Sequence, residues 1–114
     1  INEHVKFHGL KKDVTTELNK SNLLLLTSFV EGFSLSILEA LSCKIPVIST
    51  NTGGVKEQVK SGENGFLLNS FDELELSNFI ETLYKDKKLC TQIGNINRKK
   101  YLKKFLVKNY FLRI

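Results

Sequence analysis

Short apolar runs separated by helical patterns are the feature that most limits what this chain can form. The runs are residues 5–8, 23–27, 47–50 and 66–68, and the segments between them carry apolar residues at helical spacing. Strands that alternate with helices in this way form βαβ units, in which a parallel sheet is covered by helices on both faces. We therefore expect a three-layer α/β fold with a parallel sheet of these four strands.

Two details of the runs favour a parallel sheet. Residues 23–26 are consecutive leucines, as expected for a central parallel strand that is buried on both faces. Pro46 falls at the first position of a strand, where its missing N–H is least harmful.

Helices are predicted in five places. They are residues 13–20, a segment beginning at about Leu35, residues 55–60, a long amphipathic segment from about residue 71, and residues 87–105. Gly62 is expected to stop the third helix, and Gly94 is expected to break or soften the last one.

Composition places the chain among soluble globular proteins. Apolar residues make up 41% and charged residues 25% of the 114 positions, a length that fits one domain. Cys43 and Cys90 lack a CxxC motif and metal-ligand spacing, so we expect reduced thiols in a cytoplasmic protein. The longest apolar run is far shorter than the ~20 residues that span a bilayer.

The charge of the chain is unevenly distributed. Residues 85–114 hold ten Lys or Arg and one acid, whereas residues 1–84 hold seven bases and eleven acids. A basic tail suggests an anionic partner, either phospholipid or nucleic acid, although a solvated lysine-rich helix has the same composition. We expect residues 98–113 to form an amphipathic helix that meets a phospholipid surface rather than nucleic acid.

Ligands of such sheets bind beyond the carboxyl ends of the strands, which directs attention to the loop after Thr27. Gly32 lies next to a helix start, where free N–H groups and the helix dipole favour a phosphate. Glu31 and Glu39 flank this turn and offer acceptors for the hydroxyl groups of a ligand. Two alternatives remain open: Ser36 and Glu39 also fit a capping box, and Glu31 also fits a solvated loop acid.

The loop after the strand at residues 47–50 carries a second glycine turn. Gly53 and Gly54 precede a helix and are candidates for a second contact with the same ligand. A plain connection between a strand and a helix would have the same appearance. His8, at the end of the first predicted strand, is open to a similar pair of interpretations, as a ligand contact or as a structural histidine.

An ordered set of motifs resembles the glycosyltransferase family 4 (group 1) pattern. The set consists of EGFSLSILEALSCKIPVIST at residues 31–50, TGG at 52–54 with Glu57, GENGFLL at 62–68, and VKFHG at 5–9. In that family two glutamates are separated by seven residues, as Glu31 and Glu39 are here. The resemblance covers roughly residues 3–90 and implies a Rossmann-like, GT-B donor-binding domain.

The resemblance implies a role for each candidate residue. Glu31 would contact the donor sugar near the reacting centre and stabilise developing positive charge, which makes it the catalytic candidate. The backbone of Gly32, Phe33, Ser34 and Leu35 would hold a diphosphate, and Glu39 would hold the ribose. Family members retain the anomeric configuration and need no bound metal or other cofactor.

The sequence also departs from the family pattern. The N-terminal acceptor domain is missing, as are two strands and a loop with an Arg and a Lys near the diphosphate. Residues 1–114 therefore look like one partial nucleotide-sugar-binding domain, cut from a longer chain. The complete family fold has the expected strand order 3-2-1-4-5-6, in which residues 5–8 would be the third strand. Without strands one and two, residues 5–8 would lack their normal neighbour.

The resulting expectation is the donor-binding part of a retaining enzyme. That enzyme would transfer sugar from a UDP- or GDP-type donor to a glycan or lipid-linked acceptor, as in polysaccharide or lipopolysaccharide assembly. The isolated chain is expected to be inactive. The alternative is a noncatalytic nucleotide-binding or interaction module of the same fold.

Overall fold

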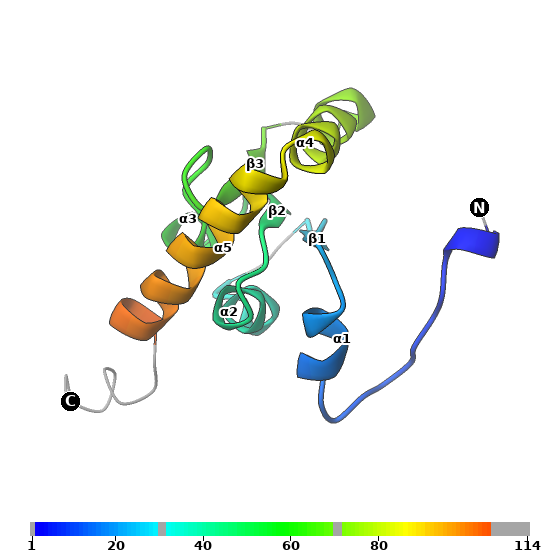
Figure 1. The fold of residues 1–114 in the computed structure, drawn as a ribbon, viewed down its shortest axis with the longest axis horizontal. Helices are drawn as coiled ribbons and strands as arrows, with labels where there is room; N and C mark the ends of the chain where they lie inside the picture. Colours follow the sequence, from blue (N-terminus) through cyan, green and yellow to red (C-terminus); the bar gives the residue numbers. More distant parts are fainter. Residues whose placement is uncertain (1, 30–31, 70–71, 106–114) are drawn as a thin grey trace.

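The computed structural model describes residues 2–29, 32–69 and 72–105 and contains a parallel sheet (Figure 1). The strands are β1 (Leu24–Leu26), β2 (Val47–Thr50) and β3 (Gly65–Leu68), in the spatial order β1-β2-β3. Leu25 is aligned with Ile48, and Ile48 is aligned with Phe66. The predicted α/β class and three of the four predicted strands are confirmed.

Helices connect and follow the strands. They are α1 (Thr15–Asn19), α2 (Leu35–Ser42), α3 (Val55–Gln58), α4 (Glu73–Lys85) and α5 (Lys87–Lys100), with a 3₁₀ turn η1 (Asn2–His4) and a π-helical turn η2 (Tyr101–Phe105). Asp72 and Asp86 cap α4 and α5 by accepting from the N–H groups of Leu74 and Leu89. Of the predicted helix over residues 98–113, residues 106–113 lie outside the described residues. Within the described part of the chain, no helix is both long and apolar enough to cross a membrane.

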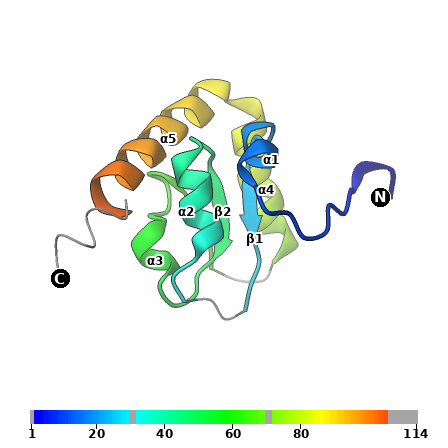
Figure 2. The ribbon, with the colours of Figure 1, turned by 90° about the horizontal axis from the view of Figure 1, so that it is seen from below.

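The sheet separates two apolar clusters, one on each face. Figure 2 shows the helices that surround the sheet. Val47 packs against α2, whereas its neighbour Ile48 packs against α4 and α5, because successive side chains of a strand point to opposite faces. The buried cluster on the α2 face comprises Ile37, Ala40, Leu41, Ile45, Val47, Val55, Val59 and Phe105, and the opposite cluster comprises Ile48, Leu68, Leu83 and Ile93. The three predicted layers are therefore present.

Helix α5 packs in the second cluster through Ile93, and η2, which follows it, contributes Phe105 to the first. The helix is also held by the end of α2 and the turn that follows. The Asn97 amide donates to the carbonyl of Ile45 at 2.8 Å, and Arg98 donates to the carbonyl of Ser42 at 3.0 Å. Gly94 is buried against Lys44, so closely that an added Cβ would lie 2.3 Å from the Lys44 carbonyl oxygen. Of the prediction that Gly94 breaks or softens the helix, the break is wrong, because the helix continues through this glycine, which allows close packing against Lys44.

The segment at residues 5–8 corrects the predicted fold. It forms no strand, and Phe7 is 93% exposed (Figure 1). Isolated extended segments are not stable without partners in a sheet, and no strand among the described residues pairs with this one. The boundary of α3 also differs, because the helix ends at Gln58 and Gly62, with φ of 84°, serves the next turn instead.

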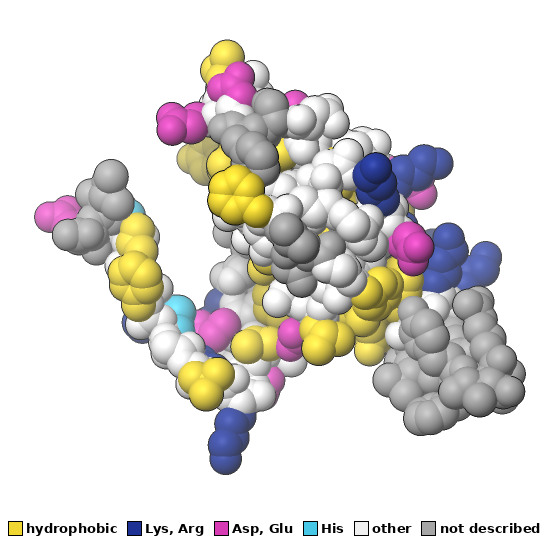
Figure 3. All heavy atoms as spheres, turned by 180° about the vertical axis from the view of Figure 1, so that it is seen from behind, with side chains coloured by type: hydrophobic (Ala, Val, Ile, Leu, Met, Phe, Trp, Pro, Cys, Tyr) yellow, Lys and Arg dark blue, Asp and Glu magenta, His cyan; other side chains and the backbone are white. Residues whose placement is uncertain are grey.

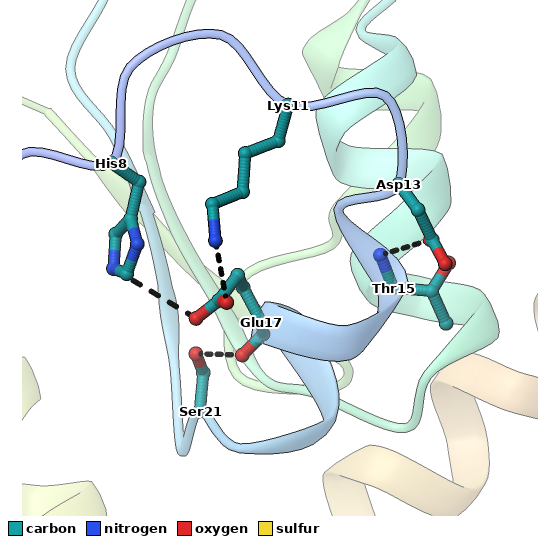
Figure 4. A network of polar contacts seen from close by, with 6 residues as sticks. All are labelled: His8, Lys11, Asp13, Thr15, Glu17 and Ser21. Carbon is teal, nitrogen blue, oxygen red and sulfur yellow. Dashed lines mark hydrogen bonds and ion pairs between the residues drawn. The ribbon is translucent and has the colours of Figure 1, made fainter.

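Polar contacts attach the segment before α1 to that helix (Figure 4). The Lys11 ammonium lies 2.9 Å from one carboxylate oxygen of Glu17, and His8 Nε2 lies 3.8 Å from the other. The hydrogen bond from Lys11 lowers the pKa of the Glu17 carboxyl. His8 thus faces α1 rather than the carboxyl ends of the strands, which favours the structural interpretation of this histidine.

We expect Gly94→Ala to destabilise the protein by about 1–3 kcal/mol, because the new methyl group overlaps the Lys44 carbonyl. The sign of this change in stability is informative, because alanine in a helix is otherwise favoured over glycine by about 1 kcal/mol. Urea unfolding monitored by circular dichroism measures the difference. Gln92→Ala, at an exposed position on the same helix, is the control and should change stability by less than about 0.5 kcal/mol. A Gly94→Ala protein as stable as the parent would contradict the packing account.

Candidate functional site

The carboxyl ends of β1 and β2 lie side by side, since Leu26 is aligned with Ser49. The loops that follow them, residues 27–34 and 51–54, therefore leave the sheet at the same edge. The Thr50 hydroxyl donates to the carbonyl of Ser28 and ties the first loop to the end of the second strand. The predicted catalytic residue, Glu31, lies outside the described residues.

The two loops are in direct backbone contact. An added Cβ at Gly54 would lie 3.3 Å from the carbonyl carbon and oxygen of Gly32 and from the nitrogen of Phe33. Gly54 thus allows the second loop to approach the first. Gly53 is exposed and has a φ of 41°, a conformation that favours glycine. Packing accounts for a glycine at position 54, and a ligand contact by Gly53 and Gly54 stays a prediction.

A buried glutamine holds the first loop from beneath. The Ser34 N–H donates to Gln58 Oε1 at 2.8 Å, and Gln58 Nε2 donates to the Ser34 carbonyl at 2.8 Å. Gln58 is completely buried, and Ser34 is 2% exposed. One side-chain amide therefore pairs with both backbone groups of one residue, as a neighbouring strand would.

An aromatic contact supports the same loop from a third element. The rings of Phe33 and Phe105 have centroids 5.5 Å apart and are tilted by 58°. Phe105 belongs to η2, at the end of α5, so the C-terminal part of the described chain contacts the loop after β1. Residues 32–34 are thus held by Gly54, Gln58 and Phe105 together.

Helix α2 begins directly after this loop. Ser34 is its N-cap, and the Ser34 hydroxyl accepts a hydrogen bond from the Ile37 N–H at 3.2 Å. The capping box of Ser36 with Glu39 is therefore wrong, because Ser36 lies inside the first turn. The N–H groups of Leu35 and Ser36 have no acceptor within the helix. These N–H groups give the edge of the sheet an anion-attracting helix terminus.

Glu39 is half-buried and lies about one turn into α2. Its backbone carbonyl accepts from Ser42, but no hydrogen bond or ion pair engages its carboxylate within the described residues. Thr52, in the second loop, has a buried hydroxyl oxygen that also finds no partner there. Buried polar atoms are normally hydrogen-bonded, so this hydroxyl marks a position where a partner is expected.

These contacts refine the set of residues that sequence reasoning selected. The Ser34 N–H is occupied by Gln58, which leaves Gly32, Phe33 and Leu35 as the candidate backbone donors of the predicted diphosphate site. Gln58, Thr52 and Phe105 were missed. Gln58 could have been found, because it lies three positions after the buried Val55, on the same face of the short helix, and next to the buried Val59. Among the described residues, no group of three His, Cys, Asp or Glu residues could hold a metal ion.

Comparison with known proteins identifies the family of this chain. The pattern of the glycosyl transferases group 1 matches residues 1–100, and the chain belongs to this family. N-acetyl-alpha-D-glucosaminyl L-malate synthase of Bacillus anthracis is 33% identical over 105 residues, which are 92% of this chain and 28% of that protein.

Solved structures extend the similarity to the fold. The Anabaena protein Alr3699/HepE in complex with UDP is 30% identical and superposes with a TM-score of 0.93, covering 98% of this chain and 31% of that one. The same protein has been crystallised with UDP-glucose. The C-terminal domain of a group 1 glycosyl transferase (LpcC) from Francisella tularensis shares the fold, with a TM-score of 0.79 at 24% identity over 90% of this chain and 53% of that one. The chain thus has the fold of part of a GT-B C-terminal domain and spans less than a third of the first two relatives.

We expect Gln58→Met to loosen the loop after β1, because methionine fills a similar volume but leaves the Ser34 N–H buried without a partner and the Ser34 carbonyl with only the Leu38 N–H at 3.3 Å. Each unpaired group costs about 1–3 kcal/mol. Hydrogen exchange of the Ser34 amide should accelerate, and urea unfolding should show lower stability. Lys56→Met, on the same short helix at an exposed position, is the control. Unchanged protection of the Ser34 amide in the Gln58→Met protein would contradict the conclusion that Gln58 holds this loop.

Proposed function

We propose that this chain is the donor-binding part of a retaining glycosyltransferase that uses a UDP- or GDP-type sugar. The observation that carries the proposal is the support of residues 32–34 from three elements, at the carboxyl edge of a parallel sheet and beside the start of α2. Ligands of open α/β sheets bind at this edge. The relative crystallised with UDP and with UDP-glucose supports the choice of ligand.

In the proposed complex the diphosphate lies against the N–H groups of Gly32, Phe33 and Leu35. These groups and the dipole of α2 would stabilise negative charge on the leaving diphosphate without a metal ion. Because the loop is already fixed, little reorganisation is needed when that charge develops. Gln58 and Gly54 act here as positioning residues for the loop.

Glu39 and Glu31 have separate roles in this proposal. The Glu39 carboxylate, which lies beyond the helix start, accepts hydrogen bonds from the ribose hydroxyls. The role proposed for Glu31 is to stabilise developing positive charge at the reacting carbon of the sugar. Gly53 and the Thr52 hydroxyl line the neighbouring loop, where they contact the donor as well.

The acceptor is proposed to be a glycan or a lipid-linked sugar, held by a second domain across the cleft from this edge. We propose in addition that the basic segment from Arg98 onward brings the enzyme to an anionic membrane surface, as a peripheral protein. Assembly of a surface polysaccharide or lipopolysaccharide would require both a glycan or lipid-linked acceptor and an enzyme at the membrane surface.

Glu39→Ala is expected to weaken binding of UDP-glucose by about 1–3 kcal/mol, the range for hydrogen bonds to a charged group. Isothermal titration with UDP-glucose, GDP-mannose and ADP-glucose measures the loss and the preferred base. Glu81→Ala removes an exposed carboxylate from α4 and is the control. A noncatalytic nucleotide-binding module would bind UDP and UDP-glucose equally, and a Glu39 variant with parental affinity would remove the ribose role.

The chain alone is expected to show no sugar transfer. Holding donor and acceptor in one cleft can account for about 7–11 kcal/mol of barrier reduction, and this contribution requires the second domain. Loss of a single preorganised donor to the leaving group costs about 10²–10³ in rate. A radiolabelled transfer assay, with the chain alone and with an added N-terminal half from a relative, tests this. Turnover by the chain alone would contradict the proposal, whereas turnover only after complementation would support it.

A further inference from the structure

A second candidate site lies away from the donor loops. An open hollow of about 430 Å³ is lined by Lys60 and Glu63, from the turn after α3, and by Lys99, Lys100, Lys103 and Lys104, from the end of α5 and from η2. We call this the lysine hollow. Its volume falls within the range of small-molecule pockets, which is about 300–1,000 Å³.

The lining of this hollow has a strong excess of positive charge. Glu63 is the one carboxylate in the lining, and it lies 3.5 Å from the Lys60 ammonium. Lys60, Lys99, Lys100 and Lys104 thus bring four ammonium groups to a hollow whose lining holds a single carboxylate. Figure 3 shows Lys and Arg side chains gathered on the side of the molecule where α5 ends.

A solvated helix face does not account for this arrangement. Lysines near a helix C-terminus interact favourably with the dipole, which explains their presence on α5. It does not explain why Lys60, from a different element, faces the same space. Lysines four positions apart on a helix also repel each other, as Lys100 and Lys104 do.

Partial burial of Lys100 strengthens the repulsion between its ammonium group and the neighbouring lysines. This side chain is half-buried, and desolvation lowers the pKa of its ammonium. The charges of Lys104 and Lys60 lower this pKa further, while the nearby Glu63 carboxylate opposes the shift. A bound anion would relieve both effects, because it supplies opposite charge where water is partly excluded.

We propose that the lysine hollow binds an anion carrying several phosphate charges, at a site separate from the donor loops. Three or more ammonium groups from two elements can surround such a ligand, and each forms a charge-assisted hydrogen bond with a phosphate oxygen. Soluble polyphosphates and the headgroups of acidic phospholipids share this chemistry. No step of this inference depends on the proposed donor site.

The test uses the complete chain with tripolyphosphate as the soluble probe, measured by isothermal titration. Lys60→Gln/Lys100→Gln should weaken binding by about tenfold or more. Lys87→Gln/Lys88→Gln removes the same charge from the other end of α5 and should have an effect of less than about twofold. Lys100→Arg keeps the charge and should retain binding. Circular dichroism and titration with UDP-glucose check that fold and donor site are unchanged.

Vesicles identify the source of the phosphate. Sedimentation with phosphatidylcholine vesicles, with and without phosphatidylglycerol, is compared for the parent and both double variants. Binding to acidic vesicles that is lost only in the Lys60/Lys100 variant supports a lipid headgroup, and binding of tripolyphosphate alone supports a soluble ligand. Equal losses in the two double variants, or no binding of either probe, would overturn the proposal.

Discussion

The burial of β2 determines the rest of this structure. All four of its residues are buried, because the strand is paired on both sides and covered by helices on both faces. Val47 and Ile48 therefore each anchor one of the two apolar clusters. The parallel pairing also determines where the candidate site lies, because it brings the ends of β1 and β2, and the loops that follow them, to one edge of the sheet.

The loop after β1 depends on groups far away in the sequence. Its backbone packs against Gly54, pairs with Gln58 and is supported by Phe105 through Phe33. A loop with free N–H groups would normally bind water and move, which weakens it as an anion site. Here the supporting contacts use the backbone groups that face the protein, while others at the helix start stay free for a ligand.

The sequence predicts the apolar parts of this structure well and the polar contacts poorly. The strand at residues 47–50 follows from its composition, because a strand buried on both faces needs apolar residues. Residues 5–8 carry a strand pattern, but a pattern cannot supply the neighbour that a strand requires. Gln58 was missed because one glutamine on a short helix resembles a solvated residue. Gly94 was misjudged for a related reason, since its role depends on the carbonyl of Lys44, fifty positions earlier.

The π-helical turn at η2 affects how this chain is compared with its relatives. Hydrogen bonds in such a turn enclose one more residue than those of an α-helix. The side chain that ends such a turn is therefore rotated about the helix axis by up to about 100° relative to its place in an uninterrupted α-helix. Because Phe105 closes this turn, its contact with Phe33 depends on that extra residue. In an alignment of group 1 chains, a one-residue gap at η2 would therefore distinguish two kinds of chain. One kind keeps an aromatic side chain under the loop after β1, and the other must hold that loop in another way.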